Sequence, residues 1–366
     1  MKKTNSEPLF HIVKRDVLPW YKSWGIRLAA IVAALIVCGL ITTITTGLNP
    51  FSVYGSFIQG AFGTARKFKI TMRDMSILLL ISLALTPAFK MRFWNIGGEG
   101  QVLVGALATA ACMILLGDKL PNVVVIIIMT VSSLAAGALW GLIPAVFKAK
   151  WNTNETLSTL MMNYIATQIV AFFTVVWEVP KGSFSIGIIN QSTEGGWLPD
   201  IFGSKYLLSI LVAAAATAAM YIYLKYSKHG YEISVVGESE KTAKYVGMKT
   251  EKVIIRTMIL SGALCGLAGL LLVGSVNHTV TTTINGGQGF TAVMVSWLAK
   301  FNPITMIFTS LLIIFLKKGA GEISTTFGLN QSFADILTGI ILFFIIGCEF
   351  FITYRIVFRK SGKEAK

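Results

Sequence analysis

Long apolar runs follow one another along almost the whole chain and constrain its fold more than any other feature. The first extends over residues 25–47, and further runs lie near residues 74–90, 97–116, 122–147, 156–177, 205–226, 254–275, 288–300, 302–317 and 333–355. A helix that crosses a bilayer needs about 20 mostly apolar residues. The sequence therefore predicts an all-α polytopic membrane protein with about ten transmembrane helices.

Composition agrees with this class. Hydrophobic residues make up 54% of the 366 residues and charged residues only 13%, against about 25% charged in an ordinary soluble domain, which excludes a soluble enzyme. The net charge of +15 would suggest a nucleic-acid partner in a soluble chain. In a membrane protein, basic residues gather in cytoplasmic loops and beside anionic lipid heads. We therefore expect contact with the lipid bilayer and no nucleic-acid polymer as partner.

Residues that could carry catalytic or metal chemistry do not cluster in the sequence. The four cysteines stand alone in apolar runs, the three histidines are far apart, and no GxxxxGK[ST] loop is present. This pattern favours neither a disulfide framework nor a zinc site, and it contains no nucleotide-binding loop. We expect no cofactor and no metal in this chain, no catalytic residue, and ATP hydrolysis, if any, in a separate subunit.

Charge predicts the orientation of the spans. Residues 1–24 are basic and precede the first span, so the positive-inside rule places the N-terminus in the cytoplasm. After a transmembrane domain over residues 25–355, an even number of spans returns the basic tail, residues 356–366, to the cytoplasm. The connection at 227–256 is then cytoplasmic and the loop at 178–204 external. Some basic residues fall on the nominally external side: Arg66, Lys67, Lys69, Arg73, Lys317 and Lys318.

Two local features bear on how the spans pack. Asn302 and Pro303 interrupt the apolar region at 288–317, which is consistent either with two short spans or with a broken helix. Glycine pairs at 137/141 and 262/266 permit close approach of helices, because packing rather than hydrophobicity drives helix association in lipid. Ordinary bundle packing is the favoured interpretation of these glycines.

Polar residues interrupt the apolar pattern in two further places. The block Asn95–Gln101 contains three glycines and begins a predicted helix; it is either a substrate-contacting break at membrane depth or a capped surface loop with Glu99 in the first helical turn. The span after Asn154 carries a polar stripe that includes Asn163 and either bonds a neighbouring helix or lines a pathway.

The connection at 227–256 reads as helix, turn and helix, with Gly247 at an interruption. It is too long for a simple helix hairpin. Its length and mixed charge are typical of a docking element for a soluble partner, and a solvated surface helix remains the alternative.

At these residues the chain resembles the permease subunits of bacterial ABC importers in the branched-chain amino acid, ribose and nucleoside group. It is most similar to the nucleoside and simple-sugar permeases. The resemblance spans most of the chain. It is carried by the block Asn95–Gln101, by residues 155–164, and by the motifs at 230–232, 236–238 and 243–248.

The resemblance implies one half of a translocation pathway in the bacterial plasma membrane. Its implied partners are a second permease, commonly a different homologue, an ABC ATPase with two nucleotide-binding modules, and an extracellular substrate-binding lipoprotein. Candidate substrate-pathway residues are Asn95, Glu99, Gln101, Asn163 and Phe290. Candidate residues for coupling to the ATPase are Glu232, Gly237, Glu238, Lys244 and Gly247.

Alternative functions remain at this point. An ion-coupled secondary transporter also needs about ten helices and broken spans, but the sequence contains no recognisable intramembrane ion site. An ABC permease for a simple sugar or another small polar solute fits the same pattern. A membrane enzyme would need a convergent catalytic cluster, which the sequence does not contain, and a permease homologue with a sensory or structural role is a further possibility.

Overall fold

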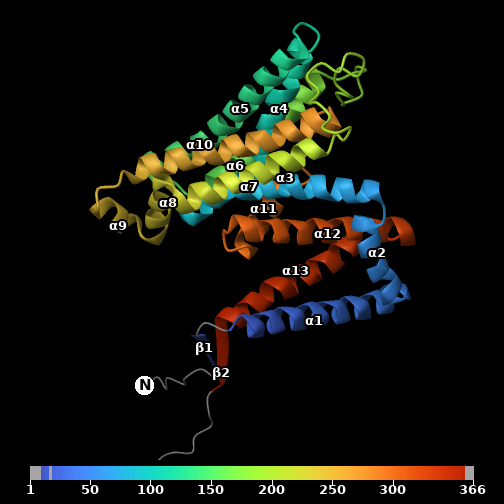
Figure 1. Ribbon diagram of the computed structural model, residues 1–366, viewed down its shortest axis with the longest axis vertical. Helices are drawn as coiled ribbons and strands as arrows, with labels where there is room; N and C mark the ends of the chain where they lie inside the picture. Colours follow the sequence, from blue (N-terminus) through green and yellow to red (C-terminus); the bar gives the residue numbers. More distant parts are fainter. Residues whose placement is uncertain (1–9, 16–18, 359–366) are drawn as a thin grey trace, which may run out of the picture. The chain divides into compact units, whose positions relative to one another are not determined.

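The structure, a computed structural model, describes residues 10–15 and 19–358, and almost every regular element in this part of the chain is a helix (Figure 1). The predicted cytoplasmic segment 1–24 and tail 356–366 therefore lie partly outside the described residues. The elements are β1 (Phe10–Lys14), α1 (Trp20–Thr46), α2 (Pro50–Phe62), α3 (Ala65–Lys90), α4 (Gly98–Leu116), α5 (Asn122–Trp151), α6 (Glu155–Val176), α7 (Leu207–Tyr226), α8 (Lys228–Glu238), α9 (Glu240–Tyr245), α10 (Thr250–Leu271), η1 (Leu272–Asn277), α11 (Gln288–Leu298), α12 (Pro303–Phe327), α13 (Gln331–Thr353) and β2 (Tyr354–Phe358).

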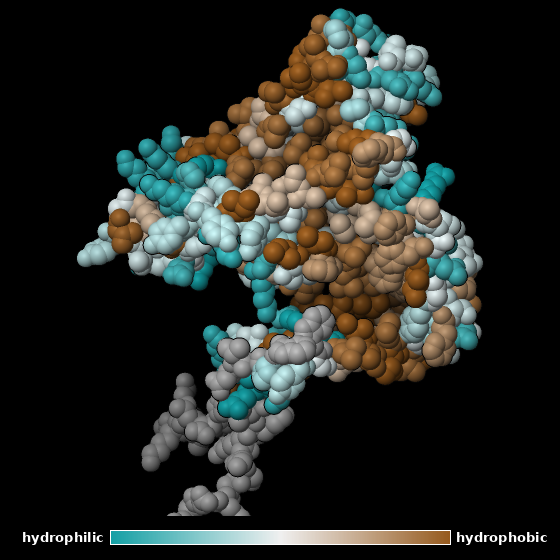
Figure 2. All heavy atoms as spheres, in the orientation of Figure 1, coloured by the Kyte–Doolittle hydropathy of each residue, from teal (hydrophilic) through white to brown (hydrophobic). Residues whose placement is uncertain are grey.

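The chain divides into two compact units. The terminal unit combines Met1–Thr64 with Phe315–Lys366, and the central unit is Ala65–Ile314. Among the described residues, eight helices are long and apolar enough to cross a membrane: α1, α4, α5, α6, α7, α10 with η1, α12 and α13. Apolar side chains cover much of the visible helical surface (Figure 2). The predicted all-α polytopic fold is confirmed.

Two predicted spans differ from the rest. Helix α3 has 26 residues, but charged residues crowd its first third, which lowers its hydropathy. Helix α11 has only 11 residues and is about 16 Å long, roughly half of the 30 Å hydrocarbon core. The span expected at 288–300 is therefore a half-length helix, separated from α12 by the break at Asn302 and Pro303. The broken-helix alternative describes this region.

Glycines bring the helices of the central unit into close contact. Helix α10 packs against α3, α4 and α5. A Cβ atom added to Gly137 would collide with the carbonyl oxygen of Gly262, and one added to Gly262 would collide with that of Gly137. The favoured interpretation of the glycine pairs is thus confirmed: they let two membrane helices meet backbone to backbone.

The helices of the central unit share two ends. At the end that we call the α8 end, the ends of α3 and α5 and the start of α10 enclose an apolar cluster with α8 and α9: Ala88, Met91, Phe93, Ala145, Ile233, Val236, Ala243, Val253, Ile254 and Met258. At the opposite end, the loop end, Asn190 of the 178–204 loop donates to the carbonyl oxygen of Met113, near the end of α4, over 2.7 Å. The basic start of α3 lies away from the α8 end, because α3 reaches that end at Lys90.

In the terminal unit, α1 packs along α13, and Arg27 forms an ion pair with Glu349 over 2.7 Å. Strands β1 and β2 pair antiparallel, with Phe10 opposite Phe358. These strands were not expected from the sequence, which suggested only polar termini. Both ends of the described chain therefore meet at the same end of this unit.

Candidate functional site

The block Asn95–Gln101 lies inside the central unit, not at its surface. The Asn95 amide donates to Ser261 Oγ of α10 over 3.1 Å, and the Asn163 amide of α6 donates to the carbonyl oxygen of Ile96 over 2.9 Å. Asn163 is eight residues from the start of α6, and Ser261 is eleven from the start of α10. Both helices start at the α8 end, so the block lies about 12 to 16 Å from that end. This depth is about half of a hydrocarbon core of about 30 Å, so the block lies near the middle of the length over which these helices can span a membrane.

Amide side chains hold the start of α4 in this position. Asn95 Oδ1 accepts from the backbone N–H of Gly97 over 3.0 Å, and Asn163 Oδ1 accepts from that of Gly100 over 2.8 Å. Gln101 donates weakly to Asn95 Oδ1 over 3.4 Å. The first N–H groups of a helix have no partner within it, so these buried amides cap α4. The block is thus a capped loop, but one at membrane depth.

Glu99 connects α4 to the half-helix α11. Its Oε2 accepts from the backbone N–H of Gly289 and from the amide of Asn285, both over 2.8 Å. Both carboxylate and amide are buried. A Cβ atom on Gly289 would lie 2.6 Å from Glu99 Cα, so only glycine permits this approach. The carboxylate stands at the N-terminus of α11, where the helix dipole favours negative charge.

A polar stretch that the sequence analysis did not single out leads into this junction. Residues 278–287, which we call the polar ribbon, run without helix from the loop end to Gly287, and α11 continues to Trp297 and the α8 end. Thr283 and Gly286 are exposed, and Thr281 and Gln288 are half-buried. The run of threonines, Asn285 and two adjacent glycines between apolar segments is the sequence signal that could have identified it.

Aromatic side chains follow the polar ribbon towards the α8 end. Phe290 is 45% exposed, and further along the same helix the Trp297 ring stacks on Trp94 with ring centroids 5.3 Å apart. Phe89 of α3 packs edge-on against both indoles. The structure thus places four candidate pathway residues, Asn95, Glu99, Gln101 and Asn163, in one buried cluster and leaves Phe290 beside it on a partly exposed face.

A cavity of about 560 Å³ opens at the loop end, where the polar ribbon begins. His278 lies in its wall and stacks in parallel on Trp197, with ring centroids 3.7 Å apart. Burial, reinforced by the positive charge of Lys205, lowers the pKa of His278 to about 4, against a smaller opposing effect of Asp200. The imidazole is therefore neutral at physiological pH.

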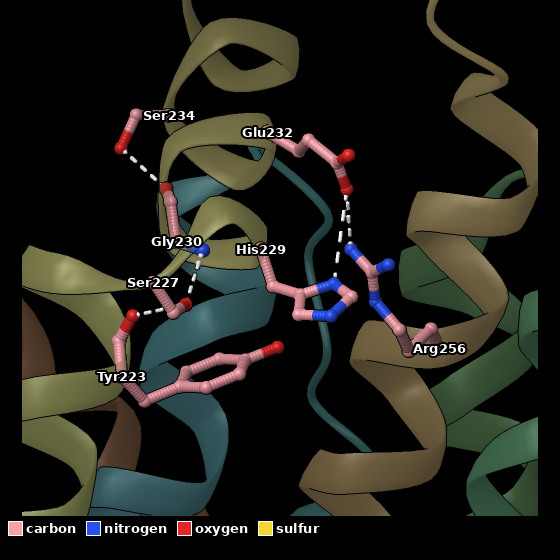
Figure 3. A network of polar contacts seen from close by, with 7 residues as sticks. All are labelled: Tyr223, Ser227, His229, Gly230, Glu232, Ser234 and Arg256. Atoms are coloured by element: carbon pink, nitrogen blue, oxygen red, sulfur yellow. Dashed lines mark hydrogen bonds and ion pairs between the residues drawn. The ribbon is translucent and has the colours of Figure 1, made fainter.

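The predicted coupling segment forms α8 and α9 at the α8 end (Figure 1). Figure 3 shows the polar contacts around α8. Arg256 of α10 donates to Glu232 Oε2 over 2.7 Å, and His229 Nδ1 lies 3.8 Å from the same oxygen. The hydrogen bond from Arg256 holds the pKa of the Glu232 carboxyl below its usual value. Ser227 caps α8 by accepting from the backbone N–H of Gly230 over 3.0 Å. Glu232 therefore links α8 to α10 through an ion pair.

The other predicted coupling residues have different surroundings. Gly237 is buried, and a Cβ atom at this position would collide with the carbonyl oxygen of Lys90. The glycine therefore permits α8 to pack closely against the end of α3. Glu238 and Lys244 are exposed, with Lys244 paired to Glu240 over 2.8 Å. Gly247 has a φ of 80°, which glycine adopts readily.

Sequence reasoning missed the apolar side chains that this segment exposes. Tyr245 is 92% exposed, and Val246 and Tyr231 are also largely exposed. Exposed large apolar groups beside one another often mark an interaction surface.

Comparisons with known proteins identify the family. Residues 68–346 match the family described as branched-chain amino acid transport system / permease component. The glucose ABC transporter permease protein TsgB13 of Haloferax volcanii is 26% identical over 365 residues, covering 96% of this chain and 95% of that protein. The guanosine ABC transporter permease protein NupP of Bacillus subtilis is 30% identical (87% and 92% covered), and the nucleoside ABC transporter permease protein NupB of Lactococcus lactis is 27% identical (84% and 86%).

Bacillus subtilis has a second similar chain, the guanosine ABC transporter permease protein NupQ, which is 27% identical over 62% of this chain and 73% of that protein. Relatives that share a transporter description within one organism indicate a second permease as partner. Such permeases are not enzymes, and the ATPase is a separate subunit. The family match and the similarity to NupP together show that the chain belongs to the branched-chain amino acid transport system permease family and is the permease component of an ABC transporter.

Proposed function

We propose that this chain forms one half of the translocation pathway of an ATP-driven nucleoside importer. The observation that carries the proposal is the polar ribbon, which is non-helical, partly exposed and continuous with the mid-membrane junction at Glu99. Irregular backbone at membrane depth is tolerated only where protein buries it or where it lines a water-filled cavity. A polar pathway closed on its other side by a second permease satisfies this condition.

The substrate class follows from the groups along this path and from the relatives. The exposed Thr283 hydroxyl and the half-buried Gln288 amide offer hydrogen bonds to a ribose, and Phe290, Trp297 and Trp94 offer aromatic faces to a base. NupP and NupB are described as guanosine and nucleoside permeases. Similarity to the glucose permease TsgB13 favours a simple sugar as the second candidate substrate.

Coupling to the ATPase is assigned to α8 and α9. The ion pair of Glu232 links this segment to α10, and Gly237 lets it pack closely against the end of α3. A displacement of α8 by the ATPase would therefore be transmitted through the end of α3 to the start of α4. Tyr245 and Val246 present an exposed apolar surface for the ATPase. Glu238, Lys244 and Gly247 are exposed in the same segment, and we assign them to this surface.

The remaining parts of the proposal concern the assembly. The α8 end faces the cytoplasm of a bacterial cell, both termini are cytoplasmic, and the 178–204 loop is external. The second permease is a different homologue, as the pair NupP and NupQ suggests. The ATPase carries two nucleotide-binding modules, and an extracellular lipoprotein delivers the substrate to the loop end.

Uptake into proteoliposomes that contain the complete transporter tests the proposal, with radiolabelled guanosine, uridine and glucose as probes. We expect ATP-dependent nucleoside uptake, and Thr283→Val on the polar ribbon should reduce its efficiency about two- to thirteenfold through the loss of one hydrogen bond of about 0.5–1.5 kcal/mol. Thr45→Val, at an exposed threonine of α1, is the matched control. Ion-driven uptake without ATP would refute the proposal. Uptake of glucose but of neither nucleoside would show that the substrate is a sugar.

A further inference from the structure

The cavity at the loop end lies outside the pathway described above and directly precedes it. Its volume of about 560 Å³ falls within the range of roughly 300–1,000 Å³ typical of small-molecule sites. It lies between the 178–204 loop and the end of α10, and the polar ribbon starts from its wall at His278. A solute that leaves this cavity towards the membrane therefore meets the ribbon first.

The cavity combines a rigid aromatic platform with polar groups. The indole N–H of Trp197 donates to the carbonyl oxygen of Ile189 over 2.9 Å, which fixes the ring against His278. His278 is only 8% exposed, and its Nδ1 is buried without a hydrogen-bond partner. The Asn277 amide and the Asp200 carboxylate line the same cavity. Stacking rings next to amide and carboxylate groups suit a planar heterocycle that carries both donors and acceptors.

The backbone at this point is also unusual. The last turn before the ribbon is the π-helix η1, and His278 follows it with a φ of 47°. Single π-helical turns occur frequently at functional sites, and a non-glycine residue in the left-handed region persists only where its surroundings impose it. Hydrogen bonds on both sides of the peptide impose it here: His278 N–H donates to Val273 over 2.9 Å, and its carbonyl accepts from Ile189 over 2.7 Å.

We infer that this cavity is an outer subsite that binds the base of a nucleoside before the nucleoside reaches the polar ribbon. The inference rests on the proposed nucleoside function and assigns a first binding position to it. The base lies against Trp197, whose other face is stacked on His278. The Asp200 carboxylate accepts N–H groups from the base edge, as it can from the N1–H and 2-amino groups of guanine, and the Asn277 amide pairs with a remaining donor or acceptor.

Protection of cysteines from a thiol reagent tests the inference in the complete transporter. Ile188→Cys and Pro199→Cys place reporters in the cavity wall without removing a proposed contact to the base, and Phe202→Cys, at a loop residue that is 95% exposed and does not line the cavity, is the matched control. Right-side-out membrane vesicles are treated with a membrane-impermeant thiol reagent, with and without guanosine. The four native cysteines are buried or half-buried, and the unsubstituted chain gives the background.

We expect guanosine at about ten times its half-saturating concentration to slow labelling of both cavity cysteines about tenfold, since only the unoccupied fraction reacts. Phe202→Cys should react at an unchanged rate, and glucose should protect neither reporter. Unchanged labelling in vesicles that import guanosine would overturn the inference and leave the proposed function standing. Equal protection by glucose, or equal slowing at Phe202→Cys, would also overturn it. Vesicles that import no nucleoside would overturn the proposed function itself. If Pro199→Cys fails to assemble, the exposed Ile188→Cys decides alone.

Discussion

Replacing Glu99 with alanine should loosen the half-helix α11 from the start of α4. The change removes the acceptor of two buried donors, the Asn285 amide and the Gly289 N–H, each 2.8 Å from Oε2. A buried donor left without an acceptor costs about 1–3 kcal/mol. The free energy of unfolding should therefore fall by about 2–6 kcal/mol relative to the unsubstituted chain.

Glu99→Gln separates the contribution of charge from that of geometry. The amide oxygen can still accept both hydrogen bonds, but bonds to a charged group contribute about 1.5–3 kcal/mol and neutral ones about 0.5–1.5 kcal/mol. The glutamine variant should thus lose roughly half as much stability as the alanine variant. Glu251→Ala, at an exposed carboxylate in the first turn of α10, is the control and should unfold like the unsubstituted chain.

Denaturation of the purified chain in lipid nanodiscs measures these differences, and nucleoside uptake by the reconstituted transporter shows their effect on function. If Glu99→Ala unfolds at the same point as the control, the carboxylate does not hold the junction and the reasoning is refuted. If Glu99→Ala and Glu99→Gln lose equal stability, the negative charge of Glu99 stabilises the junction and the acceptor oxygen kept by glutamine does not.

Three further predictions concern other parts of the central unit. Gly237→Ala should destabilise the chain by about 1–3 kcal/mol, because its Cβ collides with the Lys90 carbonyl; thermal unfolding measures this. Tyr245→Ala, at a side chain that is 92% exposed, should leave unfolding unchanged but weaken ATPase capture in a pull-down about 30-fold or more, as loss of about 2 kcal/mol implies. Because the pKa of His278 falls from 6.5 to about 4 on folding, the unfolded chain binds more protons between these values, so the contribution of His278 to stability is complete above pH 6.5 and falls by up to about 3 kcal/mol as the pH approaches 4. Denaturation of the unsubstituted chain and His278→Gln at pH 7.5 and 4.5 should show this loss only with histidine.

Much of the fold follows from local sequence. Apolar runs of span length predict membrane helices whatever their neighbours are, because each such helix satisfies its own backbone. The packing of Gly137 against Gly262 also follows from a local pattern, since small residues at the right spacing make a helix face that others can approach. The half-length of α11 was harder to predict, because periodicity cannot separate a short span from a broken helix.

The candidate site divides in the same way. The block Asn95–Gln101 was recognisable because three glycines and three polar side chains stand between apolar runs. That Asn95 and Asn163 cap the same helix start was not recognisable, because the two side chains come from different helices. Among the coupling residues, the pattern marked Glu232 and Gly237, but it could not show that both face inward while Tyr245 faces out.

By itself, the sequence determined that this chain is a membrane protein, that its helices pack through small residues, and that polar residues interrupt its apolar runs at only a few places. The reason is that hydrophobic length and helix propensity act over single segments. Only the tertiary structure decided that the break before α4 and the polar ribbon before α11 meet at membrane depth. Their meeting depends on the contact of Glu99 with Asn285 and Gly289, residues remote in the chain that no local pattern relates. The packing of the intervening helices is what brings these residues together.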